Sequence, residues 1–330
     1  MAEPNPCINV LAIDGGGIRG IIPATILAEL EKRLGKPIHE MFDLIAGTST
    51  GGIIAVAIGS GANTGEPYHP ADLVRLYVEN GPEIFRKSWI TDARKWVRPK
   101  YSPDALERIL LKFFGDTELA SARVPLLIGS YDIEGQIPFF FKSQRIPKDP
   151  NYNWKLREVA RATSAAPTFF PPVKLSNEYH ESYTLVDGGV CINNPAVAAF
   201  AEAHHIYGDG DYLIVSIGTG DRQDNLKFSA VKNWGMMQWA RQITSVFMDS
   251  VSETADQELY FLLGRERQFR FQAKLKNSSN EMDCVTPENM QHLKEDAQAC
   301  LSDNAKRFDQ LCELLKSRPR PATKGSFASA

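Results

Sequence analysis

The sequence lacks several features that mark secreted or nucleic-acid-binding chains. Its 330 residues include only five scattered cysteines, an odd number without a CxxC pair, which indicates a reducing compartment. The formal net charge is only −3, so no basic field favours a nucleic acid polymer as a partner. The six histidines form no cluster of the kind that binds metals, and no acidic run resembles a calcium loop. We therefore expect neither a metal nor a cofactor.

A leader peptide and long apolar runs are also missing. Residues 1–6 are polar and contain two prolines, unlike the basic start and apolar stretch of a signal peptide. The stretch poorest in charge, residues 44–67, is interrupted by glycines and polar residues, and its apolar part is too short to cross a bilayer. With the cysteine pattern, these absences predict a cytoplasmic protein.

Among the features that are present, the segment Gly47-Thr48-Ser49-Thr50-Gly51 is the first to suggest chemistry. It joins an apolar run typical of a buried strand, residues 42–46, to one typical of a buried helix, residues 53–58. A serine on such a strand-to-helix turn is strained, and it lies at a helix N-terminus that favours developing negative charge. Glycines at both ends leave room for the tight turn. The pattern favours Ser49 as a nucleophile, although a GxSxG segment alone also occurs in ordinary glycine-rich loops.

The segment Asp14-Gly15-Gly16-Gly17-Ile18-Arg19-Gly20 joins a predicted strand, residues 8–13, to a predicted helix, residues 21–34. Its uncovered glycine N–H groups allow an oxyanion to approach closely, and Arg19 adds positive charge at the edge. The same residues match the GxGxxG pattern of dinucleotide sites. That interpretation needs an acidic residue at the end of the second strand, but the strand leads into the serine turn and Asp43 stands near its start.

A carboxylate stands in a third glycine turn, Asp187-Gly188-Gly189, after a predicted strand at residues 183–186. Asp-Gly is a common turn dipeptide, so the pattern alone also fits a plain turn. The chain then passes through Asn194 and Pro195 into an alanine-rich helix predicted over residues 196–205. A nucleophile, a base and backbone donors are the three parts that acyl transfer requires.

These three motifs, in this order, resemble the DGGGx[RK]G, GxSxG and DG[GA] set of the patatin-like phospholipase family, which includes plant patatins and cytosolic phospholipase A2-type lipases. Residues 161–172 also resemble a segment of that family, and the likeness covers about residues 7–220 and, more loosely, extends to about 315. The resemblance implies an α/β fold of three layers, α/β/α, around a mainly parallel sheet. It implies one catalytic domain over residues 1–316, with a disordered tail expected over 317–330.

The resemblance also implies roles for single residues. Ser49 would be the nucleophile and Asp187 the general base of a Ser–Asp dyad in a lipid acyl hydrolase of the phospholipase A or lysophospholipase type. The expected oxyanion hole comprises Gly15, Gly16 and Gly17, supported by Arg19, and the residues that support the motifs are Asp14, Gly20, Gly47, Gly51, Gly188 and Gly189. Because a free carboxyl has a pKa of about 4 and is a weak base, burial must raise that value.

Three other functions stay open at this point. A Ser-His-Asp hydrolase would use His204 or His205, but both follow Asp187 within one predicted helix, and adjacent residues do not share a helix face. A regulated effector phospholipase would be activated by a nucleotide second messenger. Residues 221–330 could hold the binding site for such a nucleotide. A storage protein would keep the fold without the chemistry, which the three intact motifs disfavour.

The substrate implied is a phospholipid or another acyl lipid, with peripheral membrane contact. Residues 84–101 mix Trp89, Trp96 and Tyr101 with basic residues, which suits a bilayer interface. Residues 228–248 collect tryptophan, methionine and phenylalanine, which suits a lid or pocket wall, although such residues at helical spacing are more typical of plain core. The remaining patterns predict helices at 71–85, 103–114 and 287–315, and strands at 124–131, 137–141 and 212–217.

Overall fold

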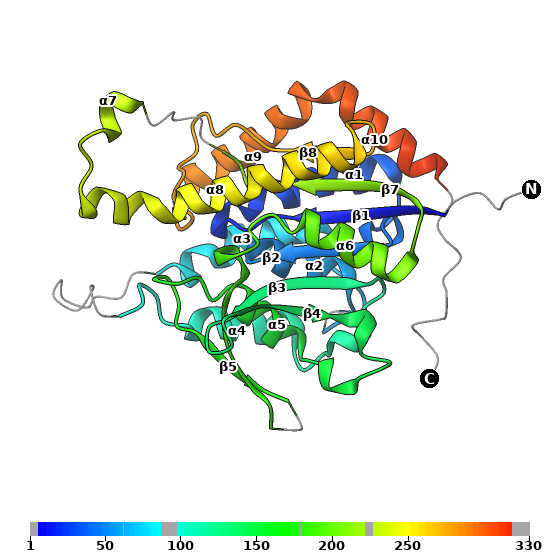
Figure 1. The fold of residues 1–330 in the computed structure, drawn as a ribbon, viewed down its shortest axis with the longest axis horizontal. Helices are drawn as coiled ribbons and strands as arrows, with labels where there is room; N and C mark the ends of the chain where they lie inside the picture. Colours follow the sequence, from blue (N-terminus) through cyan, green and yellow to red (C-terminus); the bar gives the residue numbers. More distant parts are fainter. Residues whose placement is uncertain (1–5, 62, 87–97, 178–179, 222–226, 319–330) are drawn as a thin grey trace, which may run out of the picture.

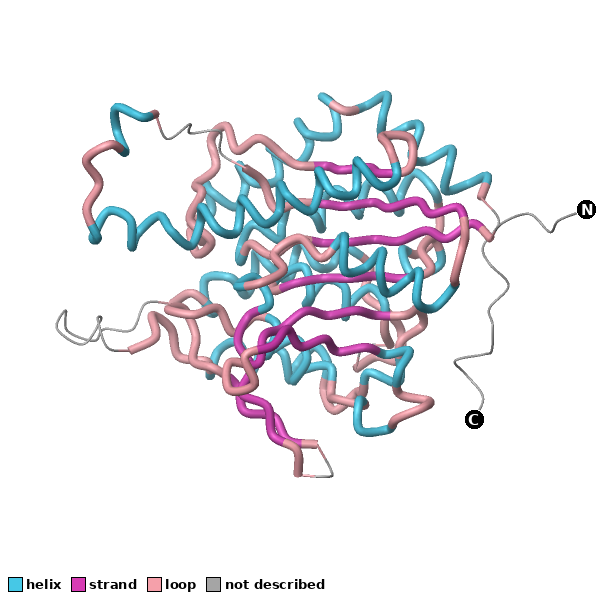
Figure 2. Tube along the Cα trace, viewed as in Figure 1, coloured by secondary structure: helices cyan, strands magenta, loops and turns pink. Residues whose placement is uncertain are grey.

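The computed structural model describes residues 6–61, 63–86, 98–177, 180–221 and 227–318. Its described residues form a central sheet of eight strands with helices on both faces, the predicted three-layer α/β/α architecture (Figures 1 and 2). The strand order is β5-β6-β3-β2-β1-β7-β8, and β4 pairs with β3.

The middle of the sheet is parallel. Its five parallel strands are β1 (Cys7–Ile13), β2 (Leu44–Thr48), β3 (Leu126–Asp132), β7 (Asp211–Ile217) and β8 (Gln268–Phe271). Antiparallel strands extend the sheet at the β3 end: β4 (Ile137–Lys142), β5 (Val173–Ser176) and β6 (Ser182–Asp187). Strands buried on both faces appear in a sequence as continuous apolar runs, which explains why β1, β2, β3 and β7 were predicted.

Alternate residues of each parallel strand pack into two separate hydrophobic cores, one on each face of the sheet. One face packs against α6 (Ala196–Tyr207) and the second half of α8 (Met236–Leu263), with Val10 and Ala12 of β1 in that core. The other face, which takes Leu11 and Ile13, is covered by the larger layer. The helices of the larger layer are α1 (Ile21–Leu34), α2 (Thr50–Gly59), α3 (Pro70–Ile84), α4 (Asp104–Phe114), α5 (Leu156–Thr163), α9 (Pro287–Asp303) and α10 (Ala305–Ser317).

Shorter helical segments complete the described chain. The α-helical turn α7 (Phe228–Val231) precedes α8. Single 3₁₀ turns are η1 (Gly17–Gly20), η2 (Ile38–Glu40), η4 (Leu119–Ser121), η5 (Ser143–Arg145), η6 (Pro150–Tyr152) and η7 (Gly188–Val190). The two that carry motif residues, η1 and η7, both follow the C-terminal end of a strand.

The C-terminal part differs from the prediction in two ways. The tract predicted as one helix over 287–315 is divided at Asn304, whose side-chain amide donates to the Cys300 carbonyl at 2.8 Å. Arg318 donates to Asn9 Oδ1 at 3.0 Å and to Asp211 Oδ2 at 2.6 Å, so the predicted start of the tail at 317 is too early. Residues 319–330 lie outside the described chain.

Gly51 provides a test of how tightly α2 packs on the first glycine loop. An alanine in a helix normally stabilises it over glycine by about 0.5–1 kcal/mol. A Cβ at Gly51 would instead collide with the Ile13 carbonyl oxygen and lie 2.6 Å from that of Asp14. We expect Gly51→Ala to lower the free energy of unfolding by about 1–3 kcal/mol in urea titrations.

The matched control is Gly235→Ala at the start of α8, where the nearest atom to the new Cβ would be Gln238 Oε1 at 3.5 Å. This variant should change the unfolding free energy by less than about 1 kcal/mol. A Gly51→Ala protein as stable as the unmodified chain would contradict the close packing.

Candidate active site

Ser49 occupies a strained turn between β2 and α2. Its backbone has φ 56° and ψ −125°, a conformation that costs free energy in any residue other than glycine. The Ser49 N–H donates to Thr163 Oγ1 at 2.9 Å, and that hydroxyl donates in turn to the Gly129 carbonyl at 2.5 Å. Thr163, at the end of α5, therefore holds the strained turn against β3, a role that the sequence analysis did not find.

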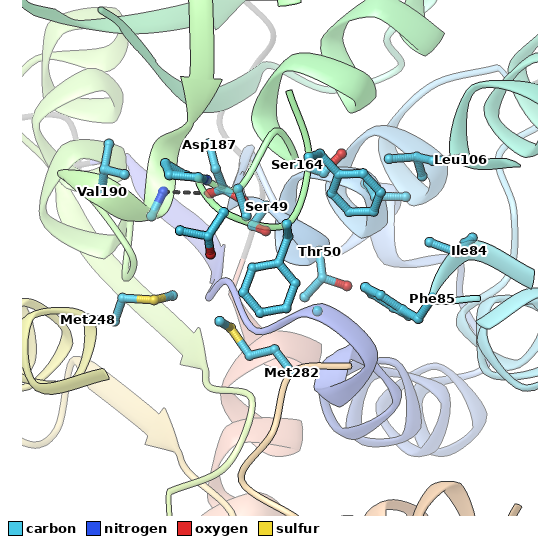
Figure 3. Close-up of a pocket in the computed structure, with 18 of the residues that line it drawn as sticks. Ser49, Thr50, Ile84, Phe85, Leu106, Ser164, Asp187, Val190, Met248 and Met282 are labelled. Carbon is cyan, nitrogen blue, oxygen red and sulfur yellow. Dashed lines mark hydrogen bonds between the residues drawn. The ribbon is translucent and has the colours of Figure 1, made fainter. Parts of the chain in front are cut away.

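Strand β3 brings Asp187 to Ser49. Thr48, the last residue of β2, pairs with Gly129, and Asp187, the last residue of β6, pairs with the next position on β3, Ser130. Because β2 runs parallel and β6 antiparallel to β3, the ends of the two strands meet. The Asp187 carboxylate accepts a hydrogen bond at 2.7 Å from the Gly189 N–H (Figure 3). The Ser49 hydroxyl lies close enough to this carboxylate to act on its pKa.

The environment of Asp187 makes it a stronger base than a free carboxylate. The residue is 4% exposed, and burial raises its pKa to about 6, although the nearby Ser49 hydroxyl and the hydrogen bond from Gly189 act in the opposite direction. A carboxyl with a pKa near the working pH accepts a proton more readily while remaining ionised at neutral pH. The shift has the direction that the sequence analysis required of a base at this position.

The glycine loop lies against the serine turn and offers two unengaged backbone donors. The N–H of Gly15 donates to the Asn193 carbonyl at 3.1 Å, so it is already satisfied. The N–H groups of Gly16 and Gly17 donate to no described residue, and Gly17 lines the cavity beside Ser49. Of the three predicted oxyanion donors, the structure therefore leaves Gly16 and Gly17 available.

Arg19 and Asp14 support this loop from outside the cavity. Arg19 is buried and donates from Nη1 to the Gly220 carbonyl at 3.3 Å and to Asn280 Oδ1 at 2.8 Å. Asp14 is paired with Arg270, whose Nη1 and Nη2 donate to the two carboxylate oxygens at 2.9 and 2.6 Å. Burial raises the pKa of Asp14 while Arg270 opposes the shift. The sequence analysis did not identify Arg270.

The remaining motif glycines stand where side chains would collide with the site. A Cβ at Gly20 would meet Thr50 Oγ1, and one at Gly47 would meet the Gly51 carbonyl. At Gly188 it would lie 2.6 Å from the Gly129 carbonyl carbon and oxygen. These glycines let the first motif pack on the second and the third motif pack on β3.

An apolar cavity of about 280 Å³ opens beside Ser49 and Asp187. Apart from Asp187, no charged side chain lines it within the described chain. Its apolar walls come from segments far apart in the sequence and include Ile84, Phe85, Leu106, Val190, Met248 and Met282 (Figure 3). A cavity of this character suits a hydrocarbon chain.

The structure describes only part of the first segment predicted to contact lipid, but it describes the second. At the start of residues 84–101, Ile84 and Phe85 line the cavity, whereas residues 87–97, with Trp89 and Trp96, lie outside the described chain. In residues 228–248, Phe247 and Met248 line the cavity. The interpretation of this second segment as plain core was wrong, because its large apolar side chains Phe228, Met236, Trp239 and Phe247 are exposed.

The other site hypotheses find no support in the described chain. His204 Nε2 lies 3.4 Å from Asp209 Oδ1, His205 is exposed, and no described histidine lines the cavity. In the glycine loop, the Ile18 N–H already donates to the Met282 carbonyl at 2.8 Å and is not available to a dinucleotide phosphate. No group of described side chains could hold a metal ion, and no described helix has the length and apolar character needed to cross a bilayer.

The fold and the site define an α/β protein with a serine–carboxylate pair beside an apolar cavity. A family model for patatin-like phospholipases matches residues 11–200. Patatin-like protein 2 of Oryza sativa subsp. indica is 33% identical over 92% of this chain and 85% of its own length, and Patatin-T5 of Solanum tuberosum is 29% identical over 97% and 93%. The chain therefore belongs to the patatin-like phospholipase family, which supports a lipid acyl hydrolase as the general class of enzyme.

The similarity to solved structures is weaker. VipD from Legionella pneumophila aligns with a TM-score of 0.42 at 14% identity, covering 96% of this chain and 67% of that one. Similarity at this level is too low to transfer residue roles or substrates between the two proteins.

Thr163→Val tests the link between α5 and the serine turn. The change removes the hydroxyl that joins the Ser49 N–H to the Gly129 carbonyl and leaves two buried backbone groups without partners. We expect the free energy of unfolding to fall by about 1–3 kcal/mol in chemical denaturation. Thr163→Ser keeps the hydroxyl and should lose much less. A larger loss in Thr163→Ser than in Thr163→Val would show that the methyl group, which valine keeps, rather than the hydrogen bonds, stabilises this position.

Proposed function

We propose that this protein hydrolyses carboxylic ester bonds of membrane lipids as a phospholipase A or lysophospholipase, with Ser49 as nucleophile and Asp187 as general base. The observation that carries the proposal is the meeting of the strained Ser49 turn with the buried Asp187 carboxylate, whose pKa burial raises to about 6, beside an apolar cavity. Membership of the patatin-like phospholipase family supports the lipid substrate.

The first half of the reaction transfers the acyl group to the enzyme. Asp187 accepts the proton of the Ser49 hydroxyl as its oxygen attacks the ester carbonyl carbon. The carbonyl oxygen becomes an oxyanion, which the unengaged N–H groups of Gly16 and Gly17 stabilise. When the tetrahedral intermediate collapses, the ester C–O bond breaks and Asp187 returns the proton to the departing alcohol or lysolipid.

The second half releases the fatty acid by the same groups in reverse. A water molecule gives a proton to Asp187 as its oxygen attacks the acyl-enzyme carbonyl, and the same N–H groups stabilise the second oxyanion. The bond to Ser49 then breaks, and Asp187 returns the proton to the serine oxygen. The proposed steps use only groups of this chain, so we expect activity to persist with EDTA present.

Substitution of the dyad gives the first test of the proposal. We expect Ser49→Ala and Asp187→Asn each to lower fatty-acid release from mixed phospholipid vesicles by about 10³-fold or more, because each removes a group that acts in both half-reactions. The matched control is the double variant His204→Ala/His205→Ala, which should retain most activity. An equal loss in the control, with its fold intact, would favour a histidine base. An inactive unmodified enzyme would overturn the proposal that the chain alone is a lipid hydrolase.

The pH dependence of the reaction follows from the pKa of Asp187, which burial raises to about 6. Because only the ionised carboxylate accepts a proton, kcat/KM should be constant above about pH 7 and fall about tenfold per pH unit well below 6. Initial rates on a soluble short-chain ester between pH 4.5 and 8 would measure this profile. An inflection near the free carboxyl value of about 4 would contradict Asp187 as the base.

The same shift predicts a gain in stability when Asp187 is neutralised. The folded carboxyl has a higher pKa than the unfolded one, so the unmodified protein loses stability as pH rises from about 4 to about 6. Asp187→Asn has no such loss, and its free energy of unfolding should exceed that of the unmodified chain by up to about 3 kcal/mol at neutral pH, with no gain near pH 4. Urea titrations at several pH values, with Ser49→Ala as control, would test this, and a difference independent of pH would contradict it.

A further inference from the structure

A helical arm, residues 227–248, exposes large apolar side chains next to the active site. It comprises α7 and the first half of α8, and Figure 1 shows it projecting past the sheet on the side where the parallel strands end. Along it Phe228 is 79% exposed, Met236 89%, Trp239 41% and Phe247 60%. Single exposed apolar residues are common on protein surfaces, but several on one projecting segment indicate a contact surface.

The charges of the arm differ from those of the rest of the chain. Although the protein has a net charge of −3, residues 227–248 contain no aspartate or glutamate, and their only charged residues are Lys227, Lys232 and Arg241. The second half of α8 is acidic, with Asp249, Glu253, Asp256 and Glu258, and it packs on the sheet layer through the buried residue Leu259. One helix therefore joins a packed acidic half to an unpacked half that is apolar and basic.

The arm is continuous with the catalytic cavity. Phe247 and Met248, at its inner end, both line the cavity that contains Ser49 and Asp187. The Met248 methyl carbon lies 3.4 Å from the position that a Cβ on Gly189 would take, and Gly189 donates the hydrogen bond to Asp187. The inner end of the arm thus reaches the cavity that contains Ser49 and Asp187.

We propose that this arm is the surface by which the protein docks on a lipid bilayer, with Phe228, Met236 and Trp239 entering the interface and Lys227 and Lys232 contacting anionic headgroups. The inference rests on the proposed lipid substrate and adds the route by which that substrate arrives. Aromatic and aliphatic side chains beside basic residues are typical of interfacial helices, and tryptophan prefers the depth of the headgroups.

A bilayer explains the arm better than a second copy of the chain does. Two arms brought together would place basic residues against basic residues, with no acidic residue in either arm to pair with them. A membrane satisfies both features at once, because its acyl region takes the apolar side chains while its anionic headgroups take the lysines. Docking would also bring the inner end of the arm, and with it the cavity, toward the acyl chains.

The test measures binding separately from catalysis. In the full-length Ser49→Ala protein, the variant Phe228→Ser/Met236→Ser/Trp239→Ser is compared by co-sedimentation with vesicles of mixed phosphatidylcholine and phosphatidylglycerol. We expect at least about tenfold weaker binding, since each residue removed buries apolar surface on docking. The three substituted residues do not line the cavity, so with Ser49 restored the variant should hydrolyse a soluble short-chain ester normally while losing vesicle hydrolysis.

The same helix offers a matched control at its other end, where Tyr260, Phe261 and Leu262 are 40%, 80% and 62% exposed. Replacing these three by serine should leave vesicle binding unchanged. Binding by the arm variant as strong as that of the parent, or an equal loss in the control, would overturn the inference. So would a change from dimer to monomer in the arm variant with vesicle binding intact, which would identify a self-association surface. Arm-dependent binding without any lipid hydrolysis would reject the proposed function and keep the docking surface.

Discussion

The site depends on two strands that end on adjacent residues of β3. Gly129 pairs with Thr48 of β2, and Ser130 pairs with Asp187 of β6. The C-terminal ends of β2 and β6 meet at this point because the two strands run in opposite directions. Ser130 fixes this register further, because its hydroxyl donates to the Val186 carbonyl at 2.7 Å. If β6 ran parallel to β3, its carboxyl end would point away from Ser49. The serine and its partner carboxylate are therefore a consequence of sheet topology rather than of a local loop.

Several groups around this junction are held in states that cost free energy. Ser49 has a positive φ, and Asp187 and Asp14 are carboxyls buried among mostly apolar surroundings. Each is stabilised by a specific partner: the Thr163 hydroxyl, the Gly189 N–H and the Arg270 guanidinium respectively. The burial that makes Asp187 costly also makes it basic, so a more stable site at this position would be a weaker base. The surrounding α/β core supplies the stability that the site lacks.

The sequence predicted the features that depend on neighbouring residues, and it missed those that depend on contacts between residues far apart in the chain. Strands β1, β2, β3 and β7 and the three glycine motifs carry local patterns, and each was located from its own residues. Strand β8 was not predicted because Gln268 and Arg270 interrupt its apolar pattern, and the main partner of Arg270, Asp14, lies far away in the sequence. The engaged N–H of Gly15 likewise depends on Asn193. The arm was interpreted as core because periodicity identifies an apolar face but not whether anything covers it.

The loop that contains Met282 forms part of the cavity wall and also contacts the glycine loop. Met282 lines the cavity with its side chain, and its carbonyl accepts the Ile18 N–H at 2.8 Å, directly after the two unengaged glycine donors. Asn280 in the same loop binds Arg19, and Asp283 accepts a hydrogen bond from the Tyr101 hydroxyl at 2.5 Å. A substrate chain that displaces this wall would therefore also move the glycine loop. Through this segment, one wall of the cavity is joined to the loop whose N–H groups we propose stabilise the oxyanion.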